Sequence, residues 1–529
     1  MARGSRAIHV PRGVLAFVSS LVALGAAACT TQREAAHPND GDERDAGEHD
    51  AGRAAAPWEH GAYLEPSPQE PGNAERGRDV LLNGSYMSCG IPLTLWDDAL
   101  LGSVIQPLLG SEGTTGLEGR TGRNASLPHT LNAFTTSDGA EVVNRNCLMC
   151  HSGKFDGQLI IGLGNASADF TRGIANGLPV GVVPDAALQL LTLTEAERSN
   201  LKKMLRTASV FGPDTAMRTV GQNPAEAFTG ILLAHHDLKT LEWSDVALRS
   251  VVVRDETGEP IADSRLTSDP PPWWRAKKKN ALFYNGMARG DHRGTMALAT
   301  AICVDSIAEA ERVDALFRDI QAFIGTLHAP AYPRAIDEEL AGDGEAIYAA
   351  NCAGCHGTYA ARSPNDDEDT YPNLLIPLEV IGTDPAVANM GVVHAPEFVD
   401  WYNGSFYGQT TRAVPDDPFA GYMPPPLDGI WATAPFLHNG SVPTIELVLN
   451  SKARPAVWRR VDLDDRNFDE DALGWPWESP RYSQAEALEA ERKYIYDSSY
   501  WSQSNAGHTF GDHLSDQERR AVIEYLKTL

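Results

Sequence analysis

Two copies of the motif C-x-x-C-H constrain this 529-residue chain more than any other feature. In this motif two thiols bond to the vinyl groups of a c-type haem, and the histidine that follows ligates the iron. A structural zinc site would instead need four ligands in one cluster, and a redox dithiol does not require the histidine. The sequence therefore predicts two covalently bound haems with a proximal histidine each. The motifs are Cys147-Leu-Met-Cys150-His151 and Cys352-Ala-Gly-Cys355-His356.

The chain is acidic, with a formal net charge of −27, and 42 % of its residues are hydrophobic. This charge argues against nucleic acid and anionic membrane surfaces as partners. It allows attraction of a basic redox partner, although an acidic surface also serves solubility. We therefore expect a small redox protein, or another electron donor or acceptor, as the partner.

Residues 1–28 have the pattern of an export signal. Basic residues precede an apolar run that is too short for a membrane span of about 20 residues. The run ends at Ala28-Cys29, which is similar to a lipoprotein cleavage site, so Cys29 is the expected lipid anchor. Ordinary signal-peptidase cleavage is the alternative. We expect a protein of the periplasm or cell envelope that contacts membrane only through this lipid, or a secreted protein if Cys29 is not lipidated.

Seven cysteines are present, and the haems and the lipid account for all except Cys89 and Cys303. In an oxidising compartment an even remainder favours a disulfide between them, and two buried free thiols are the alternative.

The chain repeats itself after an acidic segment, residues 29–72, whose composition predicts a flexible tether. We expect a helix before each attachment motif, at Glu141–Asn146 and at Glu345–Asn351. Each repeat also ends in an amphipathic helix, over Val313–Leu327 and from the capping box of Ser515 and Glu518 onward. Between them, Pro271-Pro272-Trp273 with Asn285-Gly286 recurs as Pro425-Pro426-Leu427 with Asn439-Gly440.

These correspondences predict a mainly α fold with minor β and long loops. Two enlarged cytochrome c-like haem domains would span residues 73–330 and 331–529. Because simple domains of this kind have about 100 residues, each repeat must contain large insertions.

The segment Tyr422–Thr444 resembles a region shared by bacterial di-haem cytochrome c peroxidases and their methylamine-utilisation relatives. Its Gly429–Pro435 part and Asn505–Gly511 are most similar to the di-haem rubber-oxygenase-like branch. The resemblance implies that one haem is open to peroxide or dioxygen while the other holds electrons. The chain departs from the peroxidases at Leu427-Asp428-Gly429, where they have Leu-Arg-Asn, and this argues against a plain peroxidase.

The sixth iron ligands distinguish these functions. The resemblance makes His508 the distal ligand of the second haem. Met423, in Tyr-Met-Pro-Pro, is the alternative, and neither residue is the third possibility. In the first repeat Met423 corresponds to Asp269, and nothing corresponds to the segment around His508. We therefore expect the first haem to be open or weakly ligated, and to be the site of chemistry.

Other residues around the first haem stay open to more than one interpretation. Trp273, Trp274, Phe283 and Tyr284 would line its distal pocket, lie on an electron path, or form ordinary core. A ligand that closes the site could come from His235, His236, Met217 or His292. The basic run Arg275–Lys279 would neutralise haem propionates, dock an acidic partner, or be a solvated loop. Calcium binding by Asn365–Asp369 is a further, weaker possibility.

The sequence thus predicts an exported di-haem c-type cytochrome. Its first haem would activate peroxide or dioxygen, and its second would relay electrons. The alternative is a pure electron-transfer protein in which both irons are six-coordinate. A haem-based sensor is a third possibility, without a recognisable signalling module to support it.

Overall fold

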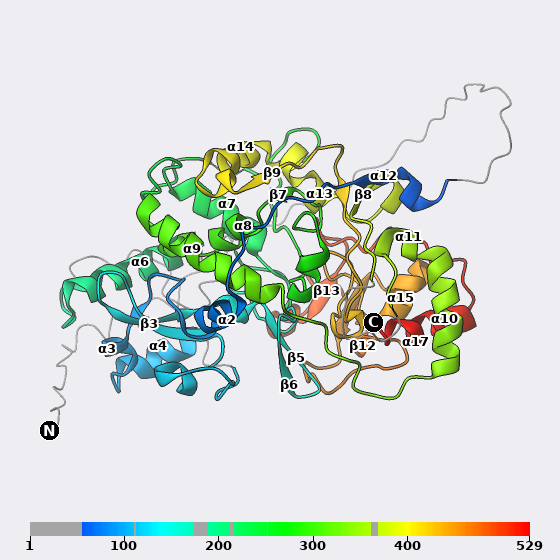
Figure 1. Ribbon diagram of the computed structural model, residues 1–529, viewed down its shortest axis with the longest axis horizontal. Helices are drawn as coiled ribbons and strands as arrows, with labels where there is room; N and C mark the ends of the chain where they lie inside the picture. The colour runs from blue at the N-terminus through cyan, green and yellow to red at the C-terminus, as the bar shows by residue number, and fades with distance from the viewer. Residues whose placement is uncertain (1–54, 110–112, 174–187, 212–214, 251, 361–368) are drawn as a thin grey trace. The chain divides into compact units, whose positions relative to one another are not determined.

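The computed structural model describes residues 55–109, 113–173, 188–211, 215–250, 252–360 and 369–529 (Figure 1). The export signal, Cys29 and most of the tether lie outside these residues. Pro57–Val182 and Leu193–Leu529 form one compact unit, which is the subject of all that follows. The boundary expected at residue 330, between two haem domains, stays a prediction.

Helix outweighs strand in the described part of the chain, at 37 % against 13 %. The fold is therefore mixed, and the expected mainly α character is only loosely met. The α-helices are α2 (Ala74–Asn83), α3 (Leu93–Trp96), α4 (Leu101–Leu109), α6 (Glu195–Phe211), α7 (Ala225–His235), α8 (Arg293–Leu298), α9 (Ile307–Ile324), α10 (Glu338–Asn351), α11 (Ala353–His356), α12 (Leu378–Ile381), α13 (Ala386–Asn389), α14 (Pro396–Gly404), α15 (Ile445–Leu449), α16 (Glu489–Arg492) and α17 (Asp516–Leu526).

The strands are short, and those of the described residues form five small sheets, ordered β1-β8-β10, β12-β11-β13, β2-β4-β3, β5-β6 and β7-β9. Their bounds are β1 (Ala62–Tyr63), β2 (Ile91–Pro92), β3 (Leu131–Thr135), β4 (Glu141–Arg145), β5 (Ser152–Phe155), β6 (Gln158–Ile161), β7 (Ala288–Gly290), β8 (Leu374–Pro377), β9 (Thr411–Ala413), β10 (Gly421–Tyr422), β11 (Val457–Arg460), β12 (Trp477–Glu478) and β13 (Ile495–Asp497). In this described part, no helix is long and apolar enough to cross a membrane.

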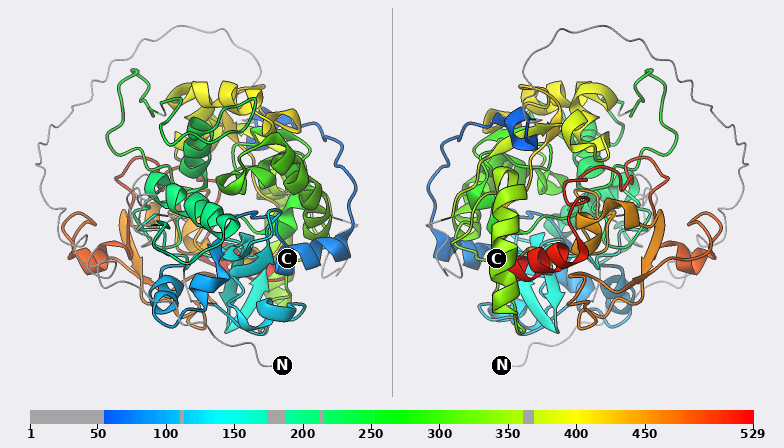
Figure 2. Two further views of the ribbon diagram at one scale, coloured as in Figure 1. Left: turned by 90° about the vertical axis from the view of Figure 1, so that its left-hand side faces the viewer. Right: turned by 90° about the vertical axis from the view of Figure 1, so that its right-hand side faces the viewer.

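Two helix crossings organise the repeats. Helix α2 packs on α9, and α10 packs on α17 (Figures 1 and 2). A glycine lies at each crossing: a Cβ added at Gly77 would meet the Asp319 carbonyl oxygen at 1.8 Å, and one at Gly344 would meet that of Ala521 at 1.9 Å. Asp319 and Ala521 hold equivalent places in the matched endings of the two closing helices. The same close helix contact is therefore made twice, and only glycine permits it.

The helix expected at Glu141–Asn146 is wrong, because Glu141–Arg145 is strand β4. It pairs with β3 and β2, and its Val142 and Val143 side chains are fully buried. Adjacent β-branched residues favour a strand over a short helix. The counterpart of α10 is α2, far upstream, so the segment between α2 and Cys147 is an insertion of the first repeat.

The structure differs from the expected tether over residues 57–72. The 3₁₀ helix η1 (Pro57–His60) is followed by β1, which pairs with β8. Leu64 is only 1 % exposed, and the Trp58 ring lies against Gly354, within the second attachment motif. Two large apolar side chains thus bury enough surface to fix a segment whose overall composition is that of a linker.

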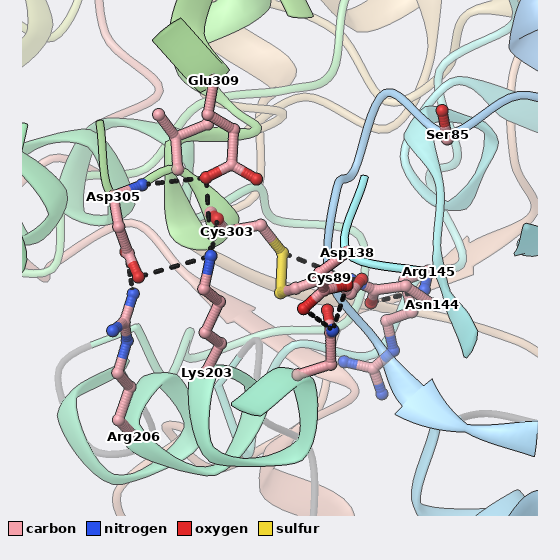
Figure 3. The surroundings of a disulfide bond; sticks show 12 residues. Ser85, Cys89, Asp138, Asn144, Arg145, Lys203, Arg206, Cys303, Asp305 and Glu309 are labelled. Carbon is pink, nitrogen blue, oxygen red and sulfur yellow. Dashed lines mark hydrogen bonds and ion pairs between the residues drawn. A yellow bond between two sulfur atoms is a disulfide. The ribbon is translucent and has the colours of Figure 1, made fainter. Parts of the chain in front are cut away.

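Cys89 and Cys303 form a disulfide, as the cysteine count predicts. It joins the segment before β2 to η5 (Ala301–Cys303), which leads into α9. Figure 3 shows its buried surroundings: Asn144 of β4 donates to the Cys89 carbonyl at 2.8 Å, and Lys203 of α6 donates to the Cys303 carbonyl at 3.3 Å. The disulfide therefore connects the inserted sheet of the first repeat to its closing helix.

Replacing Cys89 and Cys303 together by alanine should lower the free energy of unfolding by about 4 kcal/mol, because a crosslink across a long loop restricts the unfolded chain. The two residues are 214 positions apart. Thermal unfolding of variants with equal haem content measures the effect, and reductant added to the wild type should reproduce it. A melting temperature equal to that of the oxidised wild type would contradict this expectation.

Candidate haem sites

The second attachment motif lies at the junction of two helices. Cys352 ends α10 and begins α11, a single turn that carries Cys355 and His356. Nδ1 of His356 lies 2.9 Å from the Pro425 carbonyl oxygen, which orients the ring and leaves Nε2 for a metal. Gly357 ends the turn at φ +88°, where a Cβ would lie 1.9 Å from the Thr370 carbonyl oxygen. Glycine is therefore required directly after the ligand.

A mainly apolar cavity lies at this motif. Its wall combines both thiols and three imidazoles with a mainly apolar surface, and neither cysteine is in a disulfide. These residues fit a covalently bound haem. Apolar members of the wall include Trp58, Ile376, Ile381, Leu427, Ile430, Phe436, Ile445, Val448, Leu449, Phe510, Leu514, Val522 and Leu526.

His508 faces His356 in this cavity. Their ring centres are 6.2 Å apart, and the ring planes make an angle of 58°. Two imidazoles on opposite sides of one metal ion, with bonds of about 2 Å, would have ring centres roughly 6 Å apart. Burial lowers the pKa of His508 to about 3, so its ring is neutral and has a lone pair to donate. The pair therefore has the spacing of two axial ligands.

Arg454 holds the loop that carries His508. Its guanidinium donates to the Asn505, Gly507 and His508 carbonyls at 2.7, 2.7 and 3.0 Å, and also to two carbonyls of α15. The backbone N–H of His508 donates to the Ile381 carbonyl at 2.7 Å. His508 has a left-handed φ of +44°, a conformation uncommon outside glycine and often found at ligand clamps.

Met423 also lines the cavity, but its side chain packs in an apolar cluster with Leu64, Ala281 and Leu375. Its backbone N–H donates to the Tyr284 carbonyl at 2.7 Å. His438 lies in the same wall, with Nε2 3.1 Å from the Tyr422 hydroxyl and its ring stacked on that of Tyr422. Of the candidates for the sixth position, His508 is the one whose ring contacts His356.

The first attachment motif is built differently. Strand β4 leads into η3 (Cys147–Met149), and the Asn146 side chain caps this turn by accepting from the Leu148 N–H. His151 begins the β5–β6 hairpin, and its carbonyl accepts from the Gly162 N–H at 2.9 Å. Burial lowers the pKa of His151 to about 4, against an opposing effect of the Pro271 carbonyl. Nδ1 of His151 is buried without a well-formed hydrogen bond among the described residues.

The repeated Pro-to-Asn-Gly segments are matched in structure and contact each other. Met423 donates to the Tyr284 carbonyl at 2.7 Å, and the counterpart Asp269 donates to the His438 carbonyl at 2.8 Å. Each segment also closes an isolated antiparallel bridge at the same position, Leu282–Ala288 in the first and Phe436–Val442 in the second. Pro271 and Pro425, which serve the two proximal histidines, are counterparts as well. The two repeated segments therefore make equivalent bridges and exchange backbone hydrogen bonds at equivalent positions.

Trp273 and Trp274 lie between the two sites, in η4 (Trp273–Lys278). The Trp273 ring stacks on His151 with centres 4.8 Å apart and planes at 23°. That separation leaves no room for a metal between the rings, so Trp273 packs beside the proximal ligand. Trp274 is 1 % exposed, and its Nε1 donates to the Asp428 carbonyl at 2.9 Å. Trp274 belongs to the buried hydrophobic core, as one of the interpretations left open by the sequence expects, and an electron path stays a prediction.

Phe283 and Tyr284 are placed elsewhere. Phe283 is 37 % exposed, with a left-handed φ of +66°. The Tyr284 hydroxyl donates to the Asp269 carbonyl at 3.0 Å, and its ring lines the cavity of the second motif. A wall position for Tyr284 in the first haem's pocket therefore stays a prediction that these contacts do not support.

The other candidate ligands have contacts of their own. Both ring nitrogens of His236 face backbone carbonyls, those of Leu232 and Val304, and His235 stacks on Trp243. Met217 is 3 % exposed, and Nε2 of His292 is buried without a well-formed hydrogen bond among the described residues. The possible calcium segment lies outside the described residues except for Asp369, which pairs with Lys278 at 2.6 Å.

Residues 421–459 match the RoxA-like, cytochrome c-like family. The match supports the cytochrome c family. It covers much of the wall of the second cavity, from Tyr422 through His438 to Leu449. A domain of this family implies a haem cofactor and a haem-binding redox function.

Two curated relatives are similar over about half of the chain. The uncharacterized protein y4iJ of Sinorhizobium fredii (strain NBRC 101917 / NGR234) is 31 % identical over 334 residues, which cover 49 % of this chain and 53 % of that protein. The uncharacterized protein y4iM of the same organism is 25 % identical over 301 residues, covering 49 % and 64 %. The matched part thus spans less than two thirds of each relative, and neither name states an activity.

Sequence reasoning missed several residues of these sites. Trp58 lies over the second motif, although it is an isolated tryptophan in a linker-like segment. The Tyr86 hydroxyl accepts from the Cys147 N–H at 3.3 Å, and Arg454 fixes the His508 loop. A lone large aromatic residue in a linker is a usable signal for Trp58, whereas no local pattern distinguishes Tyr86 or Arg454.

Proposed function

We propose that this chain is an exported di-haem c-type cytochrome with oxidoreductase activity toward peroxide or dioxygen. The observation that carries the proposal is the asymmetry of the two proximal histidines. The ring of His356 faces a second imidazole at 6.2 Å, whereas no imidazole among the described residues is in ring contact with His151. The second site would thus offer a metal two imidazoles, and the first site one.

Haem supplies a redox-active iron that binds peroxide or dioxygen where an axial position is open. At the second site, His356 and His508 would occupy both positions and favour electron transfer over substrate binding. At the first site, His151 would supply the proximal ligand, and Trp273 restricts the orientation of its ring. The division of labour between the sites therefore follows from their ligands.

The helix η4 supports electron transfer between the sites. Trp273 stacks on His151, and Trp274 lies in one apolar cluster with Leu427 and Ile430, two residues of the second cavity wall. Adjacent indoles thus connect the proximal ligand of one site to the wall of the other. A small redox protein, attracted by the negative charge of the chain, is the proposed external partner. Export, with a lipid at Cys29, belongs to the proposal and is supported by the N-terminal sequence.

The second candidate is an electron-transfer protein without a substrate. It needs a sixth ligand at the first site. His292 is a candidate, because its Nε2 is buried without a well-formed hydrogen bond among the described residues, with the Asn280 carbonyl near its ring. In that case both sites would be six-coordinate.

Optical and EPR spectra of the haem-loaded protein test the proposal, recorded oxidised and then reduced with and without carbon monoxide. We expect one high-spin ferric signal, or carbon monoxide binding to one haem of two, because no imidazole in the described part of the chain is in ring contact with His151. The His292→Ala variant, in which that nitrogen is absent, should give the same spectra. Two low-spin signals without a carbon monoxide shift in either state would leave the electron-transfer protein.

A further inference from the structure

Arg275 is a buried cation in the wall of the second cavity. It is 6 % exposed, and it lines the cavity together with Cys352, Cys355 and His356. It belongs to η4, the helix whose Trp273 stacks on His151. A guanidinium stays protonated in proteins, so a full positive charge lies here next to a mainly apolar space.

No carboxylate among the described residues forms a hydrogen bond or an ion pair with this guanidinium. Burial lowers the pKa of Arg275, and the nearby Asp428 carboxylate opposes that shift. Nε of Arg275 donates to the Asp428 carbonyl at 3.0 Å, and Nη2 is buried without any hydrogen bond. The Asp428 carboxylate is instead paired with Lys278 at 2.5 Å. Asp269 also lines the cavity, where burial raises the pKa of its carboxyl well above the usual range and the Arg275 charge opposes this shift.

An unpaired charge in a buried site is unstable unless a ligand of opposite charge joins it. A haem carries two propionate groups, and a propionate and a guanidinium form paired, charge-assisted hydrogen bonds. We infer that Arg275 pairs with a propionate of the haem bound through Cys352 and Cys355, and so raises the reduction potential of that haem. This inference rests on the second haem of the proposed function.

Only one of the two repeats has a cation at this position. In the second repeat the position that corresponds to Arg275 is Gly429, which packs against Trp274 and Ala329 with φ +60°. No cation reaches back from this position toward the first haem. The first repeat thus supplies the counter-charge of the second haem without receiving an equivalent, and this separates the potentials of the two sites.

The Arg275→Gln variant tests the inference through the potential of each haem, measured by spectroelectrochemical titration of the loaded protein. The second haem should shift to lower potential, because loss of the cation favours the oxidised iron, while the first haem keeps its value. Arg275→Lys retains the charge and should restore most of the potential. Lys277→Gln removes one exposed charge from the same helix and is the matched control, with potentials as in the wild type.

The potentials and haem contents of these variants support or overturn the inference as follows. Unchanged potential and haem content in Arg275→Gln would overturn the inference. If Arg275→Gln loses the second haem, a loaded Arg275→Lys with a potential near that of the wild type supports the charge pairing. Loss of haem in Arg275→Lys as well would mean that shape rather than charge is needed, and would overturn the inference. A wild-type protein without haem on its Cys352 peptide, seen by mass spectrometry, would refute the proposed function itself, and with it this inference.

Discussion

The His508→Ala variant is expected to convert the second haem from low spin to high spin and to let its reduced form bind carbon monoxide. The His508 ring lies 6.2 Å from that of His356, and no other imidazole among the described residues is in ring contact with His356. Without this ligand the axial position is open to water or to an added ligand. EPR spectra of the oxidised protein and optical spectra of the reduced protein with carbon monoxide measure the change.

Two control variants make this result specific. His513→Ala removes an exposed histidine five residues along the same segment and should leave both spectra unchanged. Met423→Leu preserves the volume of a side chain that packs with Leu64 and Ala281, and should keep the second haem low spin. If the second haem is high spin in Met423→Leu and low spin in His508→Ala, then Met423 is the ligand and His508 is not.

The capping box, the helix before Cys352 and the disulfide could be predicted, because their signals are local or follow from a short count. Haem attachment at the two five-residue motifs stays a prediction. The capping box of Ser515 and Glu518 and the helix before Cys352 depend on neighbours within a few positions. The disulfide followed from elimination among seven cysteines. In these cases the residues that determine the structure are close together in the sequence or can be counted from it.

Positions that depend on distant segments could not be predicted. The sequence aligned Asp269 with Met423 and Tyr284 with His438, but it did not show that the two segments exchange hydrogen bonds across the molecule. A place beside the first haem was one of the interpretations left open for Tyr284, whose ring lines the second cavity. Aligning two repeats predicts which residues hold equivalent positions. It does not predict whether the two repeats contact each other.

The insertion in the first repeat misled the secondary-structure prediction in a related way. Before Cys352 a helix leads directly into the motif, and the same was expected before Cys147. Instead the helix contact is made by α2, and a sheet fills the space next to the motif. The close contact at Gly77 is a tertiary signal, visible only once α2 and α9 are paired. Both repeats therefore have the same helix crossing. The helix that makes it lies directly before the attachment motif in the second repeat and far before it in the first.

The crossing of α10 and α17 gives the second large effect. Gly344→Ala is expected to lower the free energy of unfolding by roughly 3 kcal/mol, since overpacking that moves backbone is among the costlier core substitutions. The added Cβ would lie 1.9 Å from the Ala521 carbonyl oxygen and 2.4 Å from its carbon, so the helices must separate. Chemical denaturation of the loaded protein measures the loss.

Gly342 supplies the matched control, two residues earlier in the same helix. It is exposed, and a Cβ there would meet nothing within 4 Å. Gly342→Ala should therefore stabilise the protein by up to about 1 kcal/mol, because alanine loses less backbone entropy in a helix. The same Gly→Ala change should thus lower the free energy of unfolding at position 344 and raise it at position 342. The first effect reports packing between the helices, and the second reports helix propensity. Equal effects at both positions would mean that α10 does not pack on α17 through Gly344.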